Sequence, residues 1–298
     1  MESHRLPRFT RSSQVAPFEL TDRDRDIIRL VHVHRFLRSS HVTSLVPGSA
    51  DAILRRLQLL YHHGYLERPR AQLDYYHAGG SRRIVYGLGN KGAALMAQEN
   101  PGSVSKRRSG EKNRSVGRIY LEHALFVSDI LVAIEIACRR NGGVGFIGAE
   151  SLLTGCGQST FRWQVDISPT VKLGVIPDSV FALERNGSRT CFFLEADRGT
   201  MPVIRKSLGQ TSMYRKFLAY AATWKQSIHR SRFGFRRFRV LSVTRSPERV
   251  ASLVQSCSEL KHGRGLFLFG DRSAIESESI LEFAWQTGRA GETSCLLT

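Results

Sequence analysis

The chain has 298 residues, of which 41% are hydrophobic and 23% charged, the balance of a globular protein long enough for two domains. Its 44 Lys and Arg residues against 26 Asp and Glu give a formal net charge of +18. This excess favours a polyanionic partner, because neutralised phosphates release counterions. Nucleic acid is the first candidate and an acidic membrane surface the second, although no apolar run reaches the roughly 20 residues of a membrane span.

The cellular compartment is indicated by the N-terminus and the cysteines. The first residues are basic but contain no apolar core, so we expect no signal peptide. The five cysteines are widely spaced and form no CxxC pair, which argues against disulfides and a cysteine zinc site. Together these features predict a cytoplasmic protein that does not bind a membrane.

Two stretches of polar composition divide the chain. Residues 1–17 are rich in Arg, and we expect a basic mobile arm there. Residues 100–115 (NPGSVSKRRSGEKNRS) combine Pro, Gly and Ser with five basic residues, which is linker composition. We therefore predict a first domain at 18–99, a second at 116–287 and a tail at 288–298. Residues 1–115 hold 20 basic and 10 acidic residues and the remainder 24 and 16, so both domains should attract a polyanion.

In the first domain, the apolar pattern predicts three helices, two strands and a closing helix. Thr21 is a good N-cap for the first helix, whose apolar stripe extends to Phe36. Gly64 ends the third helix. The later helices are expected at 41–46, 50–63 and 93–98, and the strands at 65–67 and 83–88. This order, with an Arg-rich segment between the strands, predicts a winged helix-turn-helix domain that binds double-stranded DNA.

Six arginines of this domain are candidate DNA contacts. Arg55 and Arg56 on the third helix would face the major groove. The wing arginines would reach phosphates or a minor groove, and they are Arg68, Arg70, Arg82 and Arg83. Two alternatives stay open: Arg55 and Arg56 form an ordinary solvated helix face, or the domain docks a protein.

The second domain alternates helices and strands. Asn186-Gly187 is a strong hairpin signal. Helices are predicted at 116–140, 204–228 and 247–258, and strands at 144–153, 173–183, 190–196, 238–244 and 265–269. A helix, three strands in a meander, a helix and a strand resemble the core order of the PD-(D/E)XK nuclease superfamily. The fold class is therefore α/β and multi-domain, with a winged helix followed by a nuclease-like α/β domain.

Three acids lie where this superfamily has its active site. Asp178 follows Pro177 in the second strand, and Glu195 and Asp197 end the third. Acids at the ends of adjacent strands can share Mg²⁺ or Mn²⁺, which would polarise a phosphate and activate a water. We predict Asp178, Glu195 and Asp197 as catalytic, and Asp178, Glu195 and Glu150, expected in the first strand, as metal ligands. Each acid taken alone is more typical of a solvated or capping charge.

The sequence departs from the superfamily at one position. The pattern has Lys two residues after the acid of the third strand, and here that residue is Asp197. Arg198 and Lys206 lie close by, although Arg is a poor base. Residues 198–247 contain twelve Lys and Arg and no Asp or Glu, which predicts a surface that follows phosphates, with Arg198 and Lys206 as contacts. The site could cleave slowly, act by another geometry or bind without cleaving.

Several motifs between residues 20 and 245 resemble one family. They are LTDRDRDIIRLVHVHRFL, LRRLQLLYHHGYLER, VYGLGNKGAALM, LEHALFVSDI, VIPDSVFAL, FFLEADRGTMP and YRKFLAYAATW. Together they resemble the replication-relaxation proteins of bacterial plasmids and integrative elements. The resemblance implies handling of element DNA in replication or transfer, with transfer or replication proteins as partners and a homodimer left open. A metal-dependent nickase, a non-catalytic accessory protein and a transcription regulator all remain compatible with these motifs.

Overall fold

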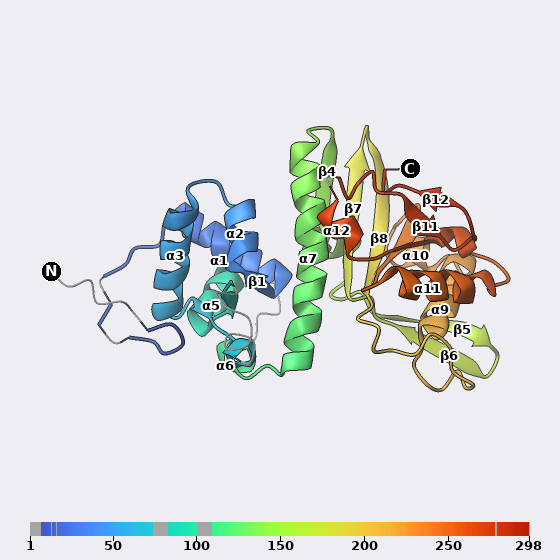
Figure 1. Ribbon diagram of the computed structural model, residues 1–298, viewed down its shortest axis with the longest axis horizontal. Coiled ribbons are helices and arrows are strands. Elements are labelled where there is room, and N and C mark those ends of the chain that lie inside the picture. The colour runs from blue at the N-terminus through green and yellow to red at the C-terminus, as the bar shows by residue number, and fades with distance from the viewer. Residues whose placement is uncertain are drawn as a thin grey trace. The chain divides into compact units, whose positions relative to one another are not determined.

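The computed structural model describes residues 7–12, 14–15, 17–73, 83–99, 109–277 and 279–297 (Figure 1). The chain forms two compact units, residues 1–132 and 133–298, and the division falls within helix α7 (Arg118–Arg140). Each unit contains helices and a β-sheet, which confirms the predicted α/β multi-domain class. None of the described helices is both long and apolar enough to cross a bilayer.

Three helices open the first unit: α1 (Asp22–His34), α2 (Ser39–Leu45) and α3 (Ala50–His62). Thr21 and Asp24 cap α1 reciprocally, because each side chain accepts a hydrogen bond from the other residue's backbone N–H. The apolar stripe of each helix faces the core, where Ile27, Val42 and Leu57 are fully buried. The predicted N-cap and the three helices are thus present.

The chain leaves α1 earlier than the sequence predicted. Arg35 adopts a φ of 65°, which ends the helix, and Phe36–Arg38 form strand β1 instead of a further helical turn. Phe36 and Leu37 are fully buried. An apolar residue at position 36 fits a helical stripe and a buried strand equally well, so its periodicity did not separate the two.

The sheet of the first unit is antiparallel, in the order β1-β3-β2. Its other elements are β2 (Leu66–Glu67), the 3₁₀ turn η1 (Arg70–Gln72), β3 (Val85–Leu88) and the helix α5 (Asn90–Glu99). Gly89 and Gly92 lie against the turn after α3, where a Cβ on either would be 2.3 Å from a backbone oxygen. These glycines let α5 begin in contact with that turn.

Polar contacts hold two segments whose composition indicated an arm and a linker. Arg11 Nε donates to the Tyr61 carbonyl at 2.9 Å, and Ser12 N donates to His62 Nδ1 at 3.1 Å. Helix α6 (Ser109–Arg114) lies inside the expected linker, and its Arg114 pairs with Glu67 at 2.9 Å. Residues 1–6 and 100–108 lie outside the described residues. Composition alone does not predict α6, because this polar helix is stabilised by contacts with residues that are distant in sequence.

The second unit is built on a seven-stranded sheet in the order β12-β11-β10-β9-β8-β7-β4. The strands are β4 (Val144–Gly148), β7 (Ser179–Arg185), β8 (Ser188–Ala196), β9 (Phe238–Val243), β10 (Phe267–Gly270), β11 (Trp285–Thr287) and β12 (Thr293–Ser294). β4, β7 and β8 are antiparallel neighbours, whereas β8, β9 and β10 run parallel. Asn186 and Gly187 both have positive φ and form the turn between β7 and β8, as their dipeptide predicted.

The helices of the second unit are the end of α7, α8 (Ala149–Cys156), α9 (Met213–Lys225), α10 (Ile228–Ser231), α11 (Pro247–Ser258) and α12 (Ser273–Glu276), with the 3₁₀ turn η2 (Arg264–Leu266). α9 and α11 contribute Phe217 and Leu253 to one core that also contains Phe193 of β8 and Phe267 of β10. This core fixes the position of α9 relative to the sheet.

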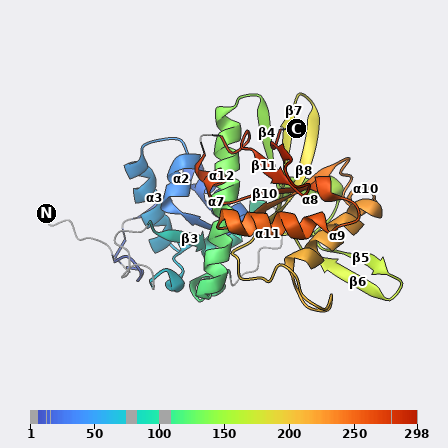
Figure 2. The same cartoon turned by 45° about the vertical axis from the view of Figure 1, so that its right-hand side comes forward.

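A separate two-stranded ribbon, β5 (Trp163–Ser168) and β6 (Val171–Val175), projects from this unit in both views (Figures 1 and 2). The sequence had predicted one strand at 173–183. Pro177 separates β6 from β7, because proline has no N–H to donate and restricts the preceding residue. The predicted strand at 144–153 is also shorter, since helix α8 begins at Ala149.

Candidate functional site

Asp178 and Glu195 are brought together by the β7–β8 hairpin. The register pairs Ser179 with Leu194, so Asp178 lies across from Glu195. Asp178 N donates to the Leu194 carbonyl at 3.0 Å, and Ala196 N donates to Asp178 Oδ2 at 2.8 Å. Two acids that are far apart in sequence therefore meet at one end of the sheet.

Helix α9 supplies both hydrogen-bond partners of Glu195. The Glu195 side chain is buried, and its Oε2 forms an ion pair with Lys216. Its Oε1 accepts a hydrogen bond from the Tyr220 hydroxyl at 2.5 Å. Lys216 and Tyr220 are four residues apart and so project from one face of α9. Neither residue was predicted as a partner of the acids, although Lys216 belongs to the predicted basic stretch 198–247 and both lie in the YRKFLAYAATW motif.

The electrostatics of this cluster are dominated by burial. Burial raises the pKa of Glu195 to about 7, although Lys216 opposes the shift. Burial alone would lower the pKa of Lys216, but the carboxylates of Glu195 and Asp178 outweigh it and raise that pKa. Burial and Glu195 together raise the pKa of Tyr220 well above its usual value. At neutral pH, Lys216 is therefore an ammonium and Tyr220 a hydrogen-bond donor.

Asp197 has different partners. Its Oδ2 accepts from Arg249 Nε at 2.7 Å and from the Thr244 hydroxyl at 3.3 Å. Its Oδ1 accepts from Gly199 N at 3.0 Å. Arg249 also donates to the Met201 carbonyl. The side chain that stands where the nuclease pattern has Lys thus fastens the segment after β8 to helix α11.

Glu150 lies in the first turn of helix α8 and is exposed, not in a strand as expected. Across the described ranges, no group of three or more His, Cys, Asp or Glu side chains is arranged to hold a metal ion. Two carboxylates, Asp178 and Glu195, do lie together. This donor set fits Mg²⁺ or Mn²⁺, because Mg²⁺ is usually bound by one or two protein carboxylates together with waters and substrate phosphates.

A cavity of about 690 Å³ opens beside this cluster. Glu195, Lys216 and Tyr220 line it on one side, and the β5–β6 ribbon closes it on another. Arg162 and Arg232 also face the cavity. The buried acid therefore borders a space that is large enough for a small ligand and whose charged lining residues, apart from Glu195, are all cations.

The six arginines of the first unit do not share one environment. Arg56 binds the buried Asp24, with Nε 2.8 Å from Oδ1, and lies over the Phe18 ring. Arg68 is buried and donates to the Tyr86 hydroxyl at 3.0 Å. The exposed members are Arg55, Arg70 and Arg83. Arg82 lies outside the described residues.

The basic stretch 198–247 is split between the two ends of the sheet. β8 and β9 are parallel with Cys191 opposite Phe238, so Arg237 lies at the end away from Glu195, where it donates to Ser188 Oγ at 2.8 Å. Arg198 is half-buried where the chain leaves β8, and Lys206 is exposed between β8 and α9. Only part of the predicted phosphate-following surface therefore borders the acids.

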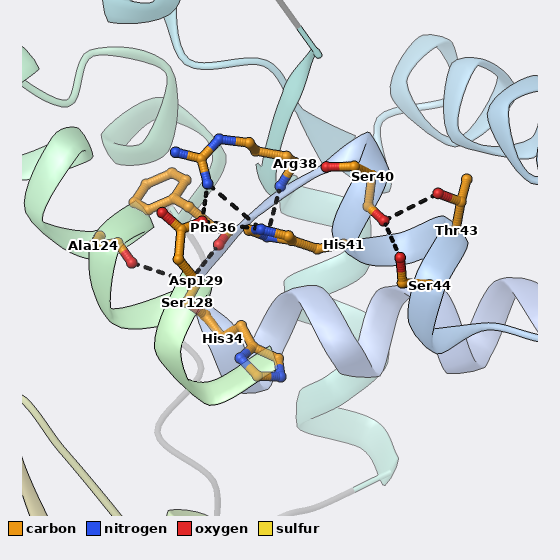
Figure 3. A network of polar contacts seen from close by, with 10 residues as sticks. All are labelled: His34, Phe36, Arg38, Ser40, His41, Thr43, Ser44, Ala124, Ser128 and Asp129. Carbon is orange, nitrogen blue, oxygen red and sulfur yellow. Dashed lines mark hydrogen bonds and ion pairs between the residues drawn. The ribbon is translucent and has the colours of Figure 1, made fainter. Parts of the chain in front are cut away.

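A polar network fastens the part of α7 that belongs to the first unit to β1 (Figure 3). Ser128 Oγ donates to the Phe36 carbonyl at 2.7 Å. Asp129 forms an ion pair with Arg38, and its Oδ1 is 3.0 Å from His41 Nε2. Ser128 and Asp129 belong to the LEHALFVSDI motif, which the sequence analysis quoted without a role. The network explains that motif as a structural clamp.

Comparison with known proteins gives one match. The family model described as replication-relaxation matches residues 28–236, which include most of the first unit and the Asp178–Glu195–Lys216 cluster. No curated protein and no solved structure matches the chain. Since the family model covers well over half of the sequence, the chain belongs to the replication-relaxation family.

Proposed function

We propose that this protein binds double-stranded DNA of a plasmid or mobile element through its first unit and nicks DNA in its second unit. The family suggests a role in the replication or transfer of such elements. One observation carries the proposal: Lys216 of α9 pairs with Glu195 beside Asp178. The lysine that is absent from position 197 is thus supplied by a helix.

The order of elements supports both halves of the proposal. In the second unit, α7, β4, β7, β8, α9 and β9 follow the core order of PD-(D/E)XK nucleases, with the parallel pair β8–β9 at its end. The β5–β6 ribbon and α8 are an insertion between the first two core strands. In the first unit, three helices and the β1-β3-β2 sheet have the winged-helix order.

Each residue of the cluster has a role in this proposal. Asp178 and Glu195 would hold Mg²⁺ or Mn²⁺, and a bound ion would polarise the scissile phosphate and acidify a coordinated water. Lys216 keeps a positive charge at the site and can donate to a phosphate oxygen, which stabilises negative charge as it develops. Tyr220 fixes the orientation of the Glu195 carboxylate.

The DNA contacts of the proposal are the exposed cations. Arg55 projects from α3 toward solvent and is the candidate base contact, while Arg70 and Arg83 are candidate phosphate contacts. Arg56 and Arg68 are engaged within the first unit, so their effect on DNA binding would be indirect. Lys206 would contact phosphates near the acids.

The test is nicking of supercoiled plasmid by the full chain in Mn²⁺, Mg²⁺ or EDTA. We expect open-circle product only with metal, and loss of that product in Asp178→Asn. Glu184→Gln is the matched control, because Glu184 lies on the same hairpin and pairs with the exposed Arg189. Absence of metal-dependent product, or Asp178→Asn activity equal to that of Glu184→Gln, would overturn the assignment.

A non-catalytic accessory role is the second candidate. It is favoured by Glu195, because both of its oxygens already have partners in Lys216 and Tyr220. That arrangement is also what a purely structural buried pair would have. Salt-sensitive DNA binding without any metal-dependent product would support this alternative over nicking.

A further inference from the structure

The cavity beside Glu195 has the size of a nucleotide site. Its volume of about 690 Å³ falls within the roughly 300–1,000 Å³ of pockets that enclose small molecules. A DNA duplex cannot enter it, since the major groove alone is about 12 Å wide. One nucleotide of an unpaired strand can.

The walls of the cavity carry unpaired positive charge. Arg162, Arg215 and Arg232 line it together with Lys216, and Glu195 is the one acid among its lining residues. Within the described residues, no carboxylate pairs with Arg162, Arg215 or Arg232, and the buried Arg215 Nε has no hydrogen-bond partner. Guanidinium groups suit phosphate because they can donate two parallel hydrogen bonds.

Apolar groups complete the site. Ile176, which follows β6, is 56% exposed and lines the cavity, as does Met201. An exposed Ile gains by covering the face of a base or sugar, because apolar surface is then removed from water. The cavity therefore offers cations for a phosphate and an apolar surface for the rest of a nucleotide.

We propose that this cavity holds one nucleotide of an unpaired DNA strand, with its phosphate on Arg162, Arg215 and Arg232. The inference rests on the proposed nicking function and deepens it, because it names the substrate as DNA with a single-stranded segment. The strand then passes Lys216 and Glu195, which border the same space. Duplex DNA is bound by the first unit, and only an unpaired strand reaches the acids.

Binding of labelled oligonucleotides to the full chain in EDTA tests this without requiring cleavage. The triple variant Arg162→Ala, Arg215→Ala, Arg232→Ala should lose affinity for a short single strand by tenfold or more. Its slope of log affinity against log salt should fall by about 0.7, since the three arginines hold one phosphate and each phosphate contact on a single strand contributes about 0.7. Affinity for a duplex should stay unchanged.

The control removes the same charge elsewhere in the unit. The triple variant Arg185→Ala, Arg236→Ala, Arg237→Ala changes cations at the opposite end of the sheet, all of them exposed. It should bind the single strand like the wild type. Equal loss in both triple variants would mean that net charge alone attracts the strand, and would overturn the proposal.

A second variant fills the cavity and keeps the charge. Gly174 lines the cavity, and a Cβ added there meets no atom within 4 Å, so Gly174→Phe should fold normally and obstruct the space. Gly145→Phe is its control, because Gly145 is also an exposed strand glycine whose added Cβ makes only ordinary contacts of 3.8 Å. Unchanged single-strand affinity in Gly174→Phe would contradict the proposal.

Competition separates a strand from a free ligand. If thymidine monophosphate displaces the oligonucleotide at similar concentrations, the cavity is a mononucleotide site and the strand proposal is wrong. If the protein binds a single strand through the cavity but never nicks plasmid, the inference about the cavity is supported and the proposed nicking activity is contradicted. Nicking that persists in Gly174→Phe would support the proposed activity and contradict the inference about the cavity.

Discussion

Each unit contains a buried carboxylate paired with a basic side chain, Asp24 with Arg56 in the first and Glu195 with Lys216 in the second, and the two pairs differ in how well they satisfy the acid. In the first unit, Asp24 receives hydrogen bonds from Arg56 and Thr21, and these outweigh burial and lower its pKa. In the second unit, burial outweighs Lys216 and raises the pKa of Glu195 to about 7.

This difference indicates which pair supports the fold and which offers a site. The forked guanidinium of Arg56 contacts both oxygens of Asp24 and leaves little for a ligand to add. Lys216 is a point charge that compensates Glu195 only in part. A metal ion that binds at Glu195 would therefore stabilise the buried negative charge that Lys216 compensates only in part. Ionisable groups with perturbed pKa values of this kind are common at functional sites. Both oxygens of Asp197 also have partners, in Arg249, Thr244 and Gly199.

The largest effect is expected when the acid of the second pair is neutralised. Glu195→Gln should lower the rate of plasmid nicking by more than the ~10–100-fold typical of residues that act behind a metal ligand. Its thermal stability should fall, because the amide oxygen can still accept from Tyr220 but the amide nitrogen then faces the Lys216 ammonium, so the nicking rates are compared at a temperature where circular dichroism shows both proteins folded. A wild-type nicking rate in this variant would remove Glu195 from the site.

A substitution in the first pair, Asp24 with Arg56, should lower the stability of the fold. Arg56→Ala leaves the fully buried Asp24 without its cation, which should lower the free energy of unfolding of the first unit by about 3–5 kcal/mol. Arg55→Ala, one residue away but exposed, should change stability by less than about 0.5 kcal/mol and weaken DNA binding instead. Chemical denaturation and DNA titration of the two variants check this contrast, which similar stabilities would contradict.

A smaller effect is expected from pH. Folding lowers the pKa of Asp24 below its ordinary value of 3.8, so the ionised acid stabilises the fold above that value and the benefit is lost as pH falls through the folded pKa. The free energy of unfolding should therefore decline below pH 3.8, and Asp24→Asn should decline less over the same range. Parallel acid unfolding curves for the two proteins would contradict this assignment.

Local patterns predicted much of this molecule. The Asn186-Gly187 turn fixes the hairpin, and the hairpin in turn aligns Asp178 with Glu195, so both acids could be located from sequence. The cap Thr21 likewise marks where α1 begins. These signals depend on neighbouring residues alone.

The remaining features depend on contacts that are distant in sequence. Lys216 is 21 residues from Glu195, and it reaches that acid only because α9 begins at Met213 and packs on the sheet. The sequence predicted a helix that begins at residue 204, so it did not indicate that α9 begins at Met213. Arg55 and Arg56 look alike in sequence, but only Arg56 meets Asp24, 32 residues away. Side-chain partners of this kind are set by tertiary packing and cannot be read from composition.

The most direct test of the account is a comparison of Lys216→Met with Lys225→Met on supercoiled plasmid in Mn²⁺. Both lysines lie on α9, and Lys225 is exposed at its end. The account predicts that Lys225→Met nicks like the wild type, whereas Lys216→Met is slower by about 100–1,000-fold, the loss typical for a positioned donor. Equal nicking by the two variants would contradict the claim that α9 supplies the missing lysine.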